Sequence, residues 1–177
     1  MRRAPMKIRN ATVDDALAIA TVHVNSWKST YQQLIPEDYL NELDIQIREA
    51  RWKKFIQAGS TIFVAVDQGE IIGFANGGQN RSTSYHYDGE LYAIYLLEEA
   101  QRKGAGKKLL CSVAKELKNE SYQSMLVWVL NGNPAANFYQ RFYPLKVDEK
   151  ETEIAGKKLL ETAFGWPHLD DLIKNCT

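Results

Sequence analysis

The clearest chemical pattern in the chain is the segment QRKGAGKKLL at residues 101–110. Gly104 and Gly106 are one residue apart, have basic residues on both sides, and come directly before an apolar periodic segment. The start of a helix leaves main-chain N–H groups without partners and carries partial positive charge, so a phosphate binds well there. Glycine lets that phosphate approach the main chain closely. The pattern predicts a phosphate-binding loop, against the simpler alternative of a glycine turn with solvated lysines.

The spacing of the glycines argues against two common kinds of phosphate site. It is neither GxxxxGK[ST] nor a GxGxxG that follows a first strand, so neither a P-loop nor a Rossmann site is supported. The elements around the loop are well marked. Residues 91–97 form an apolar segment typical of a buried strand, and residues 124–130, SMLVWVL, form a second. The helix after the loop is expected to bury one face, made by Leu109, Leu110, Val113, Ala114 and Leu117.

The other elements are expected before and after this unit. The N-terminal part predicts a strand at residues 6–10, a helix capped near Thr12, a short helix opened by Pro36 and another helix that ends at Gly59. Residues 61–75 read as a hairpin, and 76–89 as a polar loop. A helix is expected from Pro134 to Arg141, and a last strand at 156–166 paired near Lys146 and Val147. This order predicts one mixed α/β domain that spans residues 1–177.

Length and composition agree with an ordinary globular chain. It has 177 residues, of which 45% are hydrophobic and 25% charged, and its formal net charge is +0. That length buries a core without disulfides, and zero net charge argues against a nucleic-acid partner held by bulk charge. No apolar segment is long enough to span a membrane, so no membrane partner is expected. The N-terminus MRRAPMKIRN lacks the apolar segment of a secretory signal, and Met1 to Pro5 read as a short frayed extension.

Cysteine and histidine give no metal signature. Cys111 and Cys176 have no ligand spacing around them, and His23, His86 and His168 are scattered along the chain. We therefore expect no metal. Reduced thiols and a cytoplasmic location are the simpler interpretation of the two cysteines, although a disulfide between them stays open.

The glycine loop also carries a family resemblance. The pattern Gln101-x-x-Gly104-x-Gly106, after a strand and before an amphipathic helix, resembles the acyl-CoA pyrophosphate loop of the GNAT superfamily of N-acetyltransferases. The string ELYAIYLLEEAQRKGAGKKLL at residues 90–110 is similar to the central strand, loop and helix of that family. NPAANFY at 133–139 resembles its later motif, and the order of elements matches from Ile8 to about Trp166. The resemblance implies a mixed central sheet with a splayed parallel strand pair and flanking helices.

Two departures from the family pattern concern loops. Glu98 and Ala100 stand where proline and an aromatic residue are common, and Phe142-Tyr143-Pro144 replaces the usual leucine-glycine-phenylalanine. The resemblance implies acetyl-CoA as co-substrate, with its pyrophosphate on the main-chain N–H groups of the loop and its pantetheine arm between the two strands. Asn133 either contacts the pantetheine or caps the helix that follows it. The residues assigned to co-substrate binding are Leu96, whose N–H would meet the acetyl carbonyl, Gln101, Arg102, Lys103, Gly104, Ala105, Gly106, Lys107 and Asn133.

The same resemblance implies transfer of the acetyl group to an amine by direct attack in a ternary complex. A protonated alkylamine must first lose a proton, and Glu90 matches the acid that often stands at the start of the central strand, acting directly or through water. Tyr139 is placed to protonate the departing thiolate. The plain alternatives are a solvent-facing glutamate at a strand edge and a core aromatic beside Phe138 and Phe142.

The sequence gives fewer signs of which residues bind the acceptor amine. Trp27 and Tyr31 are weak candidates for its pocket, because an aromatic residue on a helix more often belongs to the core. The acceptor is expected to be a small-molecule or peptide amine, and a homodimer is compatible with the family. A second function is kept beside the enzyme: a non-catalytic acyl-CoA-binding sensor on the same fold. A sensor would need neither Glu90 nor Tyr139, so the presence of both favours the enzyme.

Overall fold

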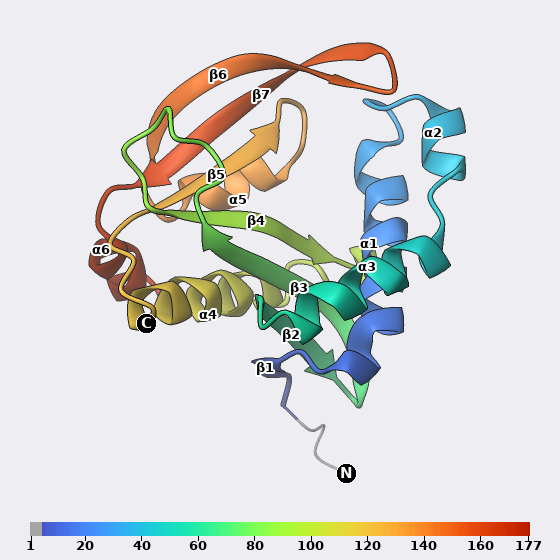
Figure 1. The fold of residues 1–177 in the computed structure, drawn as a ribbon, viewed down its shortest axis with the longest axis horizontal. Helices are drawn as coiled ribbons and strands as arrows, with labels where there is room; N and C mark the ends of the chain where they lie inside the picture. Colours follow the sequence, from blue (N-terminus) through green and yellow to red (C-terminus); the bar gives the residue numbers. More distant parts are fainter. Residues whose placement is uncertain (1–4) are drawn as a thin grey trace.

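A computed structural model describes residues 5–177 and places a seven-stranded mixed sheet at the centre of this part of the chain (Figure 1). The strand order is β1-β2-β3-β4-β5-β7-β6. The strands are β1 (Lys7–Asn10), β2 (Thr61–Asp67), β3 (Glu70–Gln79), β4 (Gly89–Leu96), β5 (Met125–Leu130), β6 (Leu145–Ile154) and β7 (Lys157–Trp166). The helices are α1 (Ala16–Tyr31), α2 (Glu37–Asn41), α3 (Ile45–Gln57), α4 (Ala105–Asn119), α5 (Ala135–Gln140) and α6 (Leu169–Lys174). Met1 to Ala4, most of the expected N-terminal extension, lie outside the described residues.

Helices cover both faces of the sheet's N-terminal half (Figure 1). Neighbouring residues of a strand point to opposite faces, and β3 shows which helices lie on each side. Phe74 packs with the buried side chains of α1 and α3, whereas Ala75 packs with those of α4. This arrangement confirms the mixed α/β fold expected from the order of elements.

Helix α4 follows the sequence prediction closely. Its expected apolar face, made by Leu109, Leu110, Val113, Ala114 and Leu117, is 0% exposed at every position. The helix begins directly after Gly104, which has φ 85° and ψ −3°. The expected cap at the N-terminus is also present, because Thr12 and Asp15 form a capping box on the short 3-10 turn (Val13–Asp15) that leads into α1.

The parallel pair β4 and β5 separates after a short contact. The two strands pair only over three positions, which are Gly89, Glu90 and Leu91 against Met125, Leu126 and Val127. Along the other edge of β4, Leu91 pairs with Gly77 but Ala93 pairs with Asn76, so Tyr92 is an extra residue in the strand. An extra residue bends a strand and increases its twist, which is consistent with the two strands diverging beyond it. The structure therefore has the splayed parallel pair that the resemblance implied.

The C-terminal part differs from expectation in two ways. The last strand is found close to its predicted position and pairs with β6, but it also inserts between β5 and β6. Helix α6, which the sequence did not predict, packs against α4 and brings Cys176 to Cys111, with the two Cα atoms 5.9 Å apart and the sulfurs bonded. The expectation of reduced thiols is therefore wrong, because the contact between α4 and α6 closes a sequence separation of 65 residues.

None of the helices in residues 5–177 has both the length and the apolar character needed to cross a membrane.

Candidate functional site

The glycine loop presents its main chain outward at the start of α4. Arg102 and Gly104 both have left-handed backbone conformations, with φ of 60° and 85°. Left-handed residues in a loop turn successive N–H groups toward one side, which is the geometry of anion-binding concavities. In the described part of the chain, none of the main-chain N–H groups from Arg102 to Lys107 donates a hydrogen bond to the protein. The loop thus has the free donors that a phosphate needs.

The two glycines have different surroundings. A Cβ at Gly104 would have no heavy atom within 4 Å, so this residue faces open space. A Cβ at Gly106 would meet the ring of Phe138 at 3.4 Å and the side chain of Leu96 at 3.5 Å, which are ordinary contacts. Gly104 is therefore required mainly by its positive φ, whereas neither the backbone conformation nor the packing at Gly106 requires a glycine in the protein without ligand.

Three tyrosines from three elements meet beside the splayed strands. Tyr31 of α1 and Tyr139 of α5 are each 5% exposed, and Tyr95 lies on β4 beyond the paired segment. Their phenols are close enough to affect one another's ionisation. Burial is the main cause that raises the pKa of Tyr139 well above its ordinary value, so this phenol keeps its proton at neutral pH.

Asn133 links this cluster to α5. Its Oδ1 accepts a hydrogen bond from the Ala135 N–H at 2.9 Å, and its Nδ2 donates to the Tyr31 hydroxyl at 3.0 Å. The side chain thus fixes the start of the helix that carries Tyr139. Trp27, the other weak acceptor candidate, lies beside Tyr31 with ring centroids 4.8 Å apart, and its Nε1 is buried near Tyr95.

Glu90 is a buried carboxylate with one cationic partner. It is 3% exposed, and its Oε1 accepts from Nη2 of Arg81 at 2.7 Å. Its Oε2 accepts from the main-chain N–H of Arg81 at 2.9 Å, and Arg81 Nε lies 3.3 Å from both oxygens. The hydrogen bond and charge of Glu90 raise the pKa of the Arg81 guanidinium. The plain alternative of a solvent-facing glutamate does not describe this residue.

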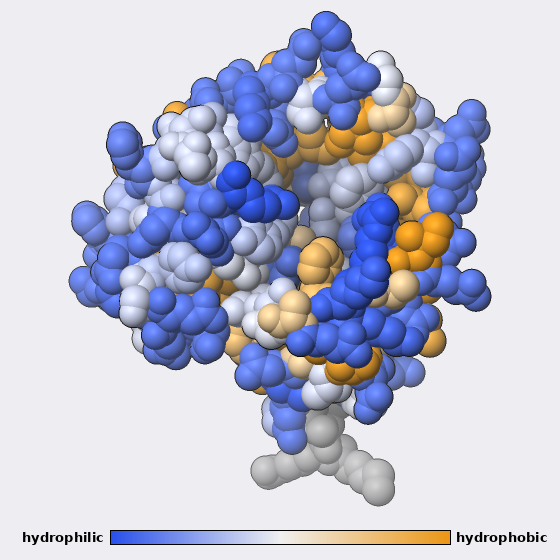
Figure 2. Space-filling view, viewed as in Figure 1, coloured by the Kyte–Doolittle hydropathy of each residue, from blue (hydrophilic) through white to orange (hydrophobic). Residues whose placement is uncertain are grey.

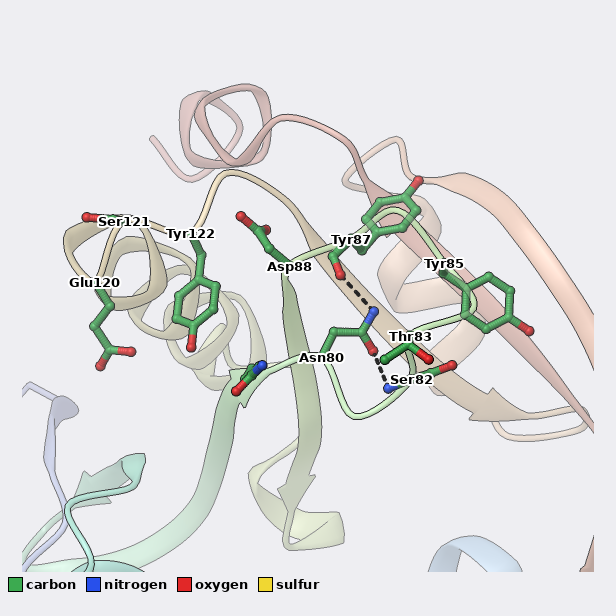
Figure 3. A pocket seen from close by; sticks show the side chains of 10 residues that line it. Asn80, Ser82, Thr83, Tyr85, Tyr87, Asp88, Glu120, Ser121 and Tyr122 are labelled. Atoms are coloured by element: carbon green, nitrogen blue, oxygen red, sulfur yellow. Dashed lines mark hydrogen bonds between the residues drawn. The ribbon is translucent and has the colours of Figure 1, made fainter.

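Hydrogen bonds and packing against β6 and β7 hold segment 80–88, which contains Arg81, in place. Asn80 donates from Nδ2 to the Tyr87 carbonyl at 2.8 Å and accepts from the Ser82 N–H at 3.0 Å, as the dashed lines in Figure 3 show. The Tyr87 ring lies on Gly165 of β7, where a Cβ would come within 2.4 Å of it. The Tyr85 hydroxyl donates to Asp148 of β6. The main chain at Arg81 is therefore fixed relative to Glu90, whereas the Arg81 side chain is 65% exposed.

Segment 80–88 also lines a pocket of about 660 Å³ together with the C-terminal end of α4. Its lining includes several hydroxyl groups, the amides of Gln79 and Asn80, and the carboxylates of Asp88 and Glu120 (Figure 3). The pocket lies at the start of β4, whereas the glycine loop follows the end of that strand. It is therefore separate from the expected phosphate site.

Charged and aromatic side chains from β5, β6 and β7 pack beside segment 80–88, and Glu161 of β7 is close enough to act on the charge of Arg81. Lys150 Nζ lies 4.1 Å from the centre of the Trp128 ring and 3.6 Å from Glu161 Oε1. Tyr85 packs edge-on against Trp128, with ring centroids 5.6 Å apart. Figure 2 shows a hollow in the molecular surface between the β6–β7 hairpin and the side formed by α1 and α2. The carboxylates of Glu90, Asp148 and Glu161 each have a partner within the chain.

The structure brings most of the predicted site residues into two groups. Residues 101–107 form the glycine loop, with Leu96 beside it at the end of β4. Tyr139 and Tyr31 belong to the tyrosine cluster, Asn133 and Trp27 contact it, and Glu90 lies farther back on β4, where the strands still pair. Sequence reasoning missed Arg81, because an arginine in a polar loop nine positions before Glu90 gives no pattern. No group of three or more His, Cys, Asp or Glu side chains within residues 5–177 is arranged to hold a metal ion.

The sheet order, the splayed parallel pair and the glycine-capped helix beside it define the architecture of an acetyltransferase. The family model described as "Acetyltransferase (GNAT) family" matches residues 24–143. The chain is also 48% identical over 166 residues to the "Uncharacterized N-acetyltransferase YuaI" of Bacillus subtilis (strain 168), covering 93% of this chain and 95% of that one. The chain belongs to the acetyltransferase (GNAT) family, as the loop and the asparagine motif indicated.

Solved structures agree on the fold. The putative acetyltransferase yncA from Salmonella typhimurium, solved with its cofactor acetyl-CoA, has a TM-score of 0.72 at 20% identity, covering 94% of this chain and 95% of that one. The paia N-acetyltransferase from Thermoplasma acidophilum, in complex with coenzyme A, has a TM-score of 0.67 at 21% identity, covering 89% and 98%. An N-acetyltransferase from Staphylococcus aureus Mu50 has a TM-score of 0.72 at 21% identity, covering 94% and 99%.

Proposed function

We propose that this N-acetyltransferase moves an acetyl group from acetyl-CoA to a primary amine by direct attack in a ternary complex, and that residues 1–177 act as one domain. The observation that carries the proposal is the glycine loop, whose six main-chain N–H groups are free beside an open parallel strand pair. Family relatives of the same fold have been solved with acetyl-CoA or coenzyme A. Sequence, fold and site chemistry therefore support the same reaction.

The chain has suitable groups for each part of the co-substrate. The N–H groups from Arg102 to Lys107 would hold the pyrophosphate, with the positive end of the α4 dipole behind them. Where β4 and β5 no longer pair, their main chains would hold the pantetheine arm, and the Leu96 N–H would meet the acetyl carbonyl. Acetyl-CoA, when bound, supplies an acetyl group activated as a thioester.

The two ionisable residues would divide the proton transfers. In the reaction a C–N bond forms between the amine and the acetyl carbon, and the C–S bond breaks. Glu90 lies six residues before Leu96 on β4, so it would take up the proton that the amine loses through a relay of water molecules. Tyr139 would give a proton to the sulfur and regain one from solvent. Its raised pKa supports this role, because the phenol is protonated when the reaction begins.

The burial of Glu90 and Tyr139 distinguishes the proposed enzyme from a sensor that only binds acyl-CoA. A sensor has no need for a buried carboxylate or for a buried phenol beside the open strand pair. Glu90 is 3% and Tyr139 5% exposed, so each ionisable group lies inside the protein, where a binding function alone has no use for it. Both features favour the enzyme.

A thiol-release assay tests the proposal with acetyl-CoA and a panel of amines, amino acids, polyamines, aminoglycosides and peptides. We expect turnover with at least one acceptor class. In Glu90→Gln we expect lower turnover, most strongly below the pKa of the acceptor amine, while calorimetry shows unchanged acetyl-CoA affinity. Acetyl-CoA binding without turnover on the whole panel would instead support the sensor, and an unchanged pH–rate profile in Glu90→Gln would reduce Glu90 to a structural role.

A further inference from the structure

Helix α5 is short, and a side-chain hydrogen bond holds it near each end. It has six residues, and Pro134 at its N-cap gives it no side-chain hydrogen bond. Beyond its C-terminal end, Trp166 of β7 donates from Nε1 to the Phe142 carbonyl at 2.8 Å. At its N-terminal end the corresponding contact comes from Tyr31 of α1, by way of Asn133. A helix of this length has little stability of its own, so its position depends on such contacts.

Asn133 joins the end of β5 to the first turn of α5. Its main-chain N–H donates to the Leu130 carbonyl at 3.0 Å, and its own carbonyl accepts from the Ala136 N–H at 3.2 Å. Its Oδ1 accepts from the Ala135 N–H at 2.9 Å. Its Nδ2 donates to the Tyr31 hydroxyl at 3.0 Å. Every polar group of Asn133 therefore has a partner, and the contact from Nδ2 is the one that reaches another part of the chain.

Tyr31 is a fixed partner for that amide. It is the last residue of α1 and is buried, and its ring lies edge-on to Trp27. It also belongs to an apolar cluster with Leu40 and Leu130. Because this packing holds the ring, the hydroxyl oxygen stays in one place and sets the orientation of the Asn133 amide. Helix α1 thus holds the start of α5, although 102 residues separate Tyr31 from Asn133.

Tyr139 lies one helical turn after the start of α5. Ala135 and Tyr139 are four residues apart, so they share a face of the helix. A shift or rotation at Ala135 therefore moves the Tyr139 ring, whose phenol lies close enough to Tyr31 for the two to affect each other's ionisation. Proton transfer to the thioester sulfur needs the phenol within hydrogen-bond reach. A misplacement of about 1 Å can cost a reaction on the order of 100-fold in rate.

We propose that Tyr31 is a positioning residue for the acetyl transfer, whose hydroxyl holds Asn133 and thereby keeps Tyr139 aligned with the thioester sulfur. This role rests on the proposed function, in which Tyr139 gives the proton. It differs from the role expected from sequence, because Tyr31 acts through Asn133 and not on the acceptor amine. The hydroxyl therefore matters for turnover and not for acceptor binding.

Tyr31→Phe tests the role, because it keeps the ring and removes only the hydroxyl that Asn133 contacts. With an acceptor that the full-length wild type acetylates, thiol release should show kcat about 10-fold lower, a smaller fall than in Tyr139→Phe. The acceptor KM and the Kd for acetyl-CoA should stay within about 2-fold of wild type. Tyr39→Phe is the matched control, because it removes a hydroxyl from the same apolar cluster and leaves the hydrogen bonds of Asn133 in place.

Two results of this comparison would overturn the inference. One is an unchanged kcat in Tyr31→Phe, or a fall that Tyr39→Phe reproduces. The other is a higher acceptor KM with an unchanged kcat, which would place the Tyr31 hydroxyl in the acceptor pocket instead. Urea titration of each variant establishes that it is folded under the conditions of the assay.

A double-mutant cycle separates positioning of Tyr139 from a general disturbance of the site. In Tyr139→Phe the donor proton is gone, so adding Tyr31→Phe should lower kcat no further, whereas independent effects would multiply. A further fall of about 10-fold in the double variant would show that the Tyr31 hydroxyl acts elsewhere, and would contradict the proposal.

Asn133→Ser tests the link between the two tyrosines. A serine hydroxyl can still accept from the Ala135 N–H, but its side chain is one atom shorter and does not reach Tyr31. We expect kcat to fall as in Tyr31→Phe, and to fall no further when both changes are combined. Multiplied effects would contradict the link. Normal turnover in Tyr31→Phe refutes this inference alone, whereas acetyl-CoA binding without acetylation of any amine by the wild type refutes the proposed function and this inference with it.

Discussion

Because Gly104 has a left-handed backbone conformation, adding a single methyl group at this residue tests whether the loop binds phosphate. Gly104 has φ 85°, and a Cβ there would have no heavy atom within 4 Å. In Gly104→Ala the new methyl therefore causes no clash, and the variant changes only the cost of the left-handed conformation, which is about 1–2 kcal/mol for an L-residue.

The magnitude of the binding effect follows from that conformational cost. Without ligand the loop can relax to relieve the strain, and binding must then restore the conformation that presents the N–H groups. A cost of about 1–2 kcal/mol corresponds to a Kd for acetyl-CoA about 5- to 30-fold higher. Contact between the methyl and the bound phosphate would raise the Kd further, because Gly104 faces the open side of the loop.

Gly59 provides a matched control at the end of α3. It has φ 79°, and a Cβ there would also have no heavy atom within 4 Å. Gly59→Ala should therefore lower the free energy of unfolding by a similar amount, measured by urea denaturation, without changing acetyl-CoA affinity. Calorimetry on both variants measures the Kd. A folded Gly104→Ala that binds acetyl-CoA as tightly as the wild type and Gly59→Ala would refute the assignment of this loop.

Three more outcomes follow from buried groups. Tyr139→Phe keeps the ring and removes the proton, so turnover should fall about 100-fold with stability and acetyl-CoA affinity nearly unchanged; parental turnover would leave Tyr139 as a core aromatic. Burial, together with the nearby charges of Arg48 and Arg51, lowers the pKa of His23, which accepts from Trp52 Nε1, to about 4. As the pH falls, His23 takes up a proton in the unfolded chain before it does so in the folded protein. The free energy of unfolding, measured by urea titration, should therefore drop by about 2 kcal/mol between pH 7 and pH 5, and His23→Gln should lack that part of the drop. Reducing the disulfide, which closes a separation of 65 residues, should cost about 4 kcal/mol of unfolding free energy, and equal urea midpoints for oxidised and reduced protein would contradict its contribution.

The elements that sequence predicted well are those whose pattern is local. The helical spacing from Leu109 to Leu117 and the glycine before it predicted α4 and its buried face, and all five apolar positions are buried. The resemblance also anticipated the splayed parallel pair. It could not show how the splay arises, because the extra residue at Tyr92 appears only when β4 is aligned with β3.

The features that sequence missed depend on contacts between distant segments. The disulfide forms because α6 packs on α4, and α6 is six residues long with little periodicity to reveal it. Asn133 had two open roles, and its hydrogen bonds to Ala135 and Tyr31, which support the role of orienting α5, join residues that spacing alone does not bring together. The partner of Glu90 could not be found from spacing, because Arg81 reaches it from an irregular loop.

The proposed reaction forms an amide from acetyl-CoA and an amine. The most direct measurement is mass spectrometry of the acceptor after incubation with full-length protein and acetyl-CoA that carries an isotope-labelled acetyl group. We expect the labelled acetyl group to appear on the acceptor nitrogen, in step with release of the CoA thiol, and both signals to be strongly reduced in Glu90→Gln. Thiol release without labelled amide, or tight acetyl-CoA binding with neither signal for any amine, would contradict it.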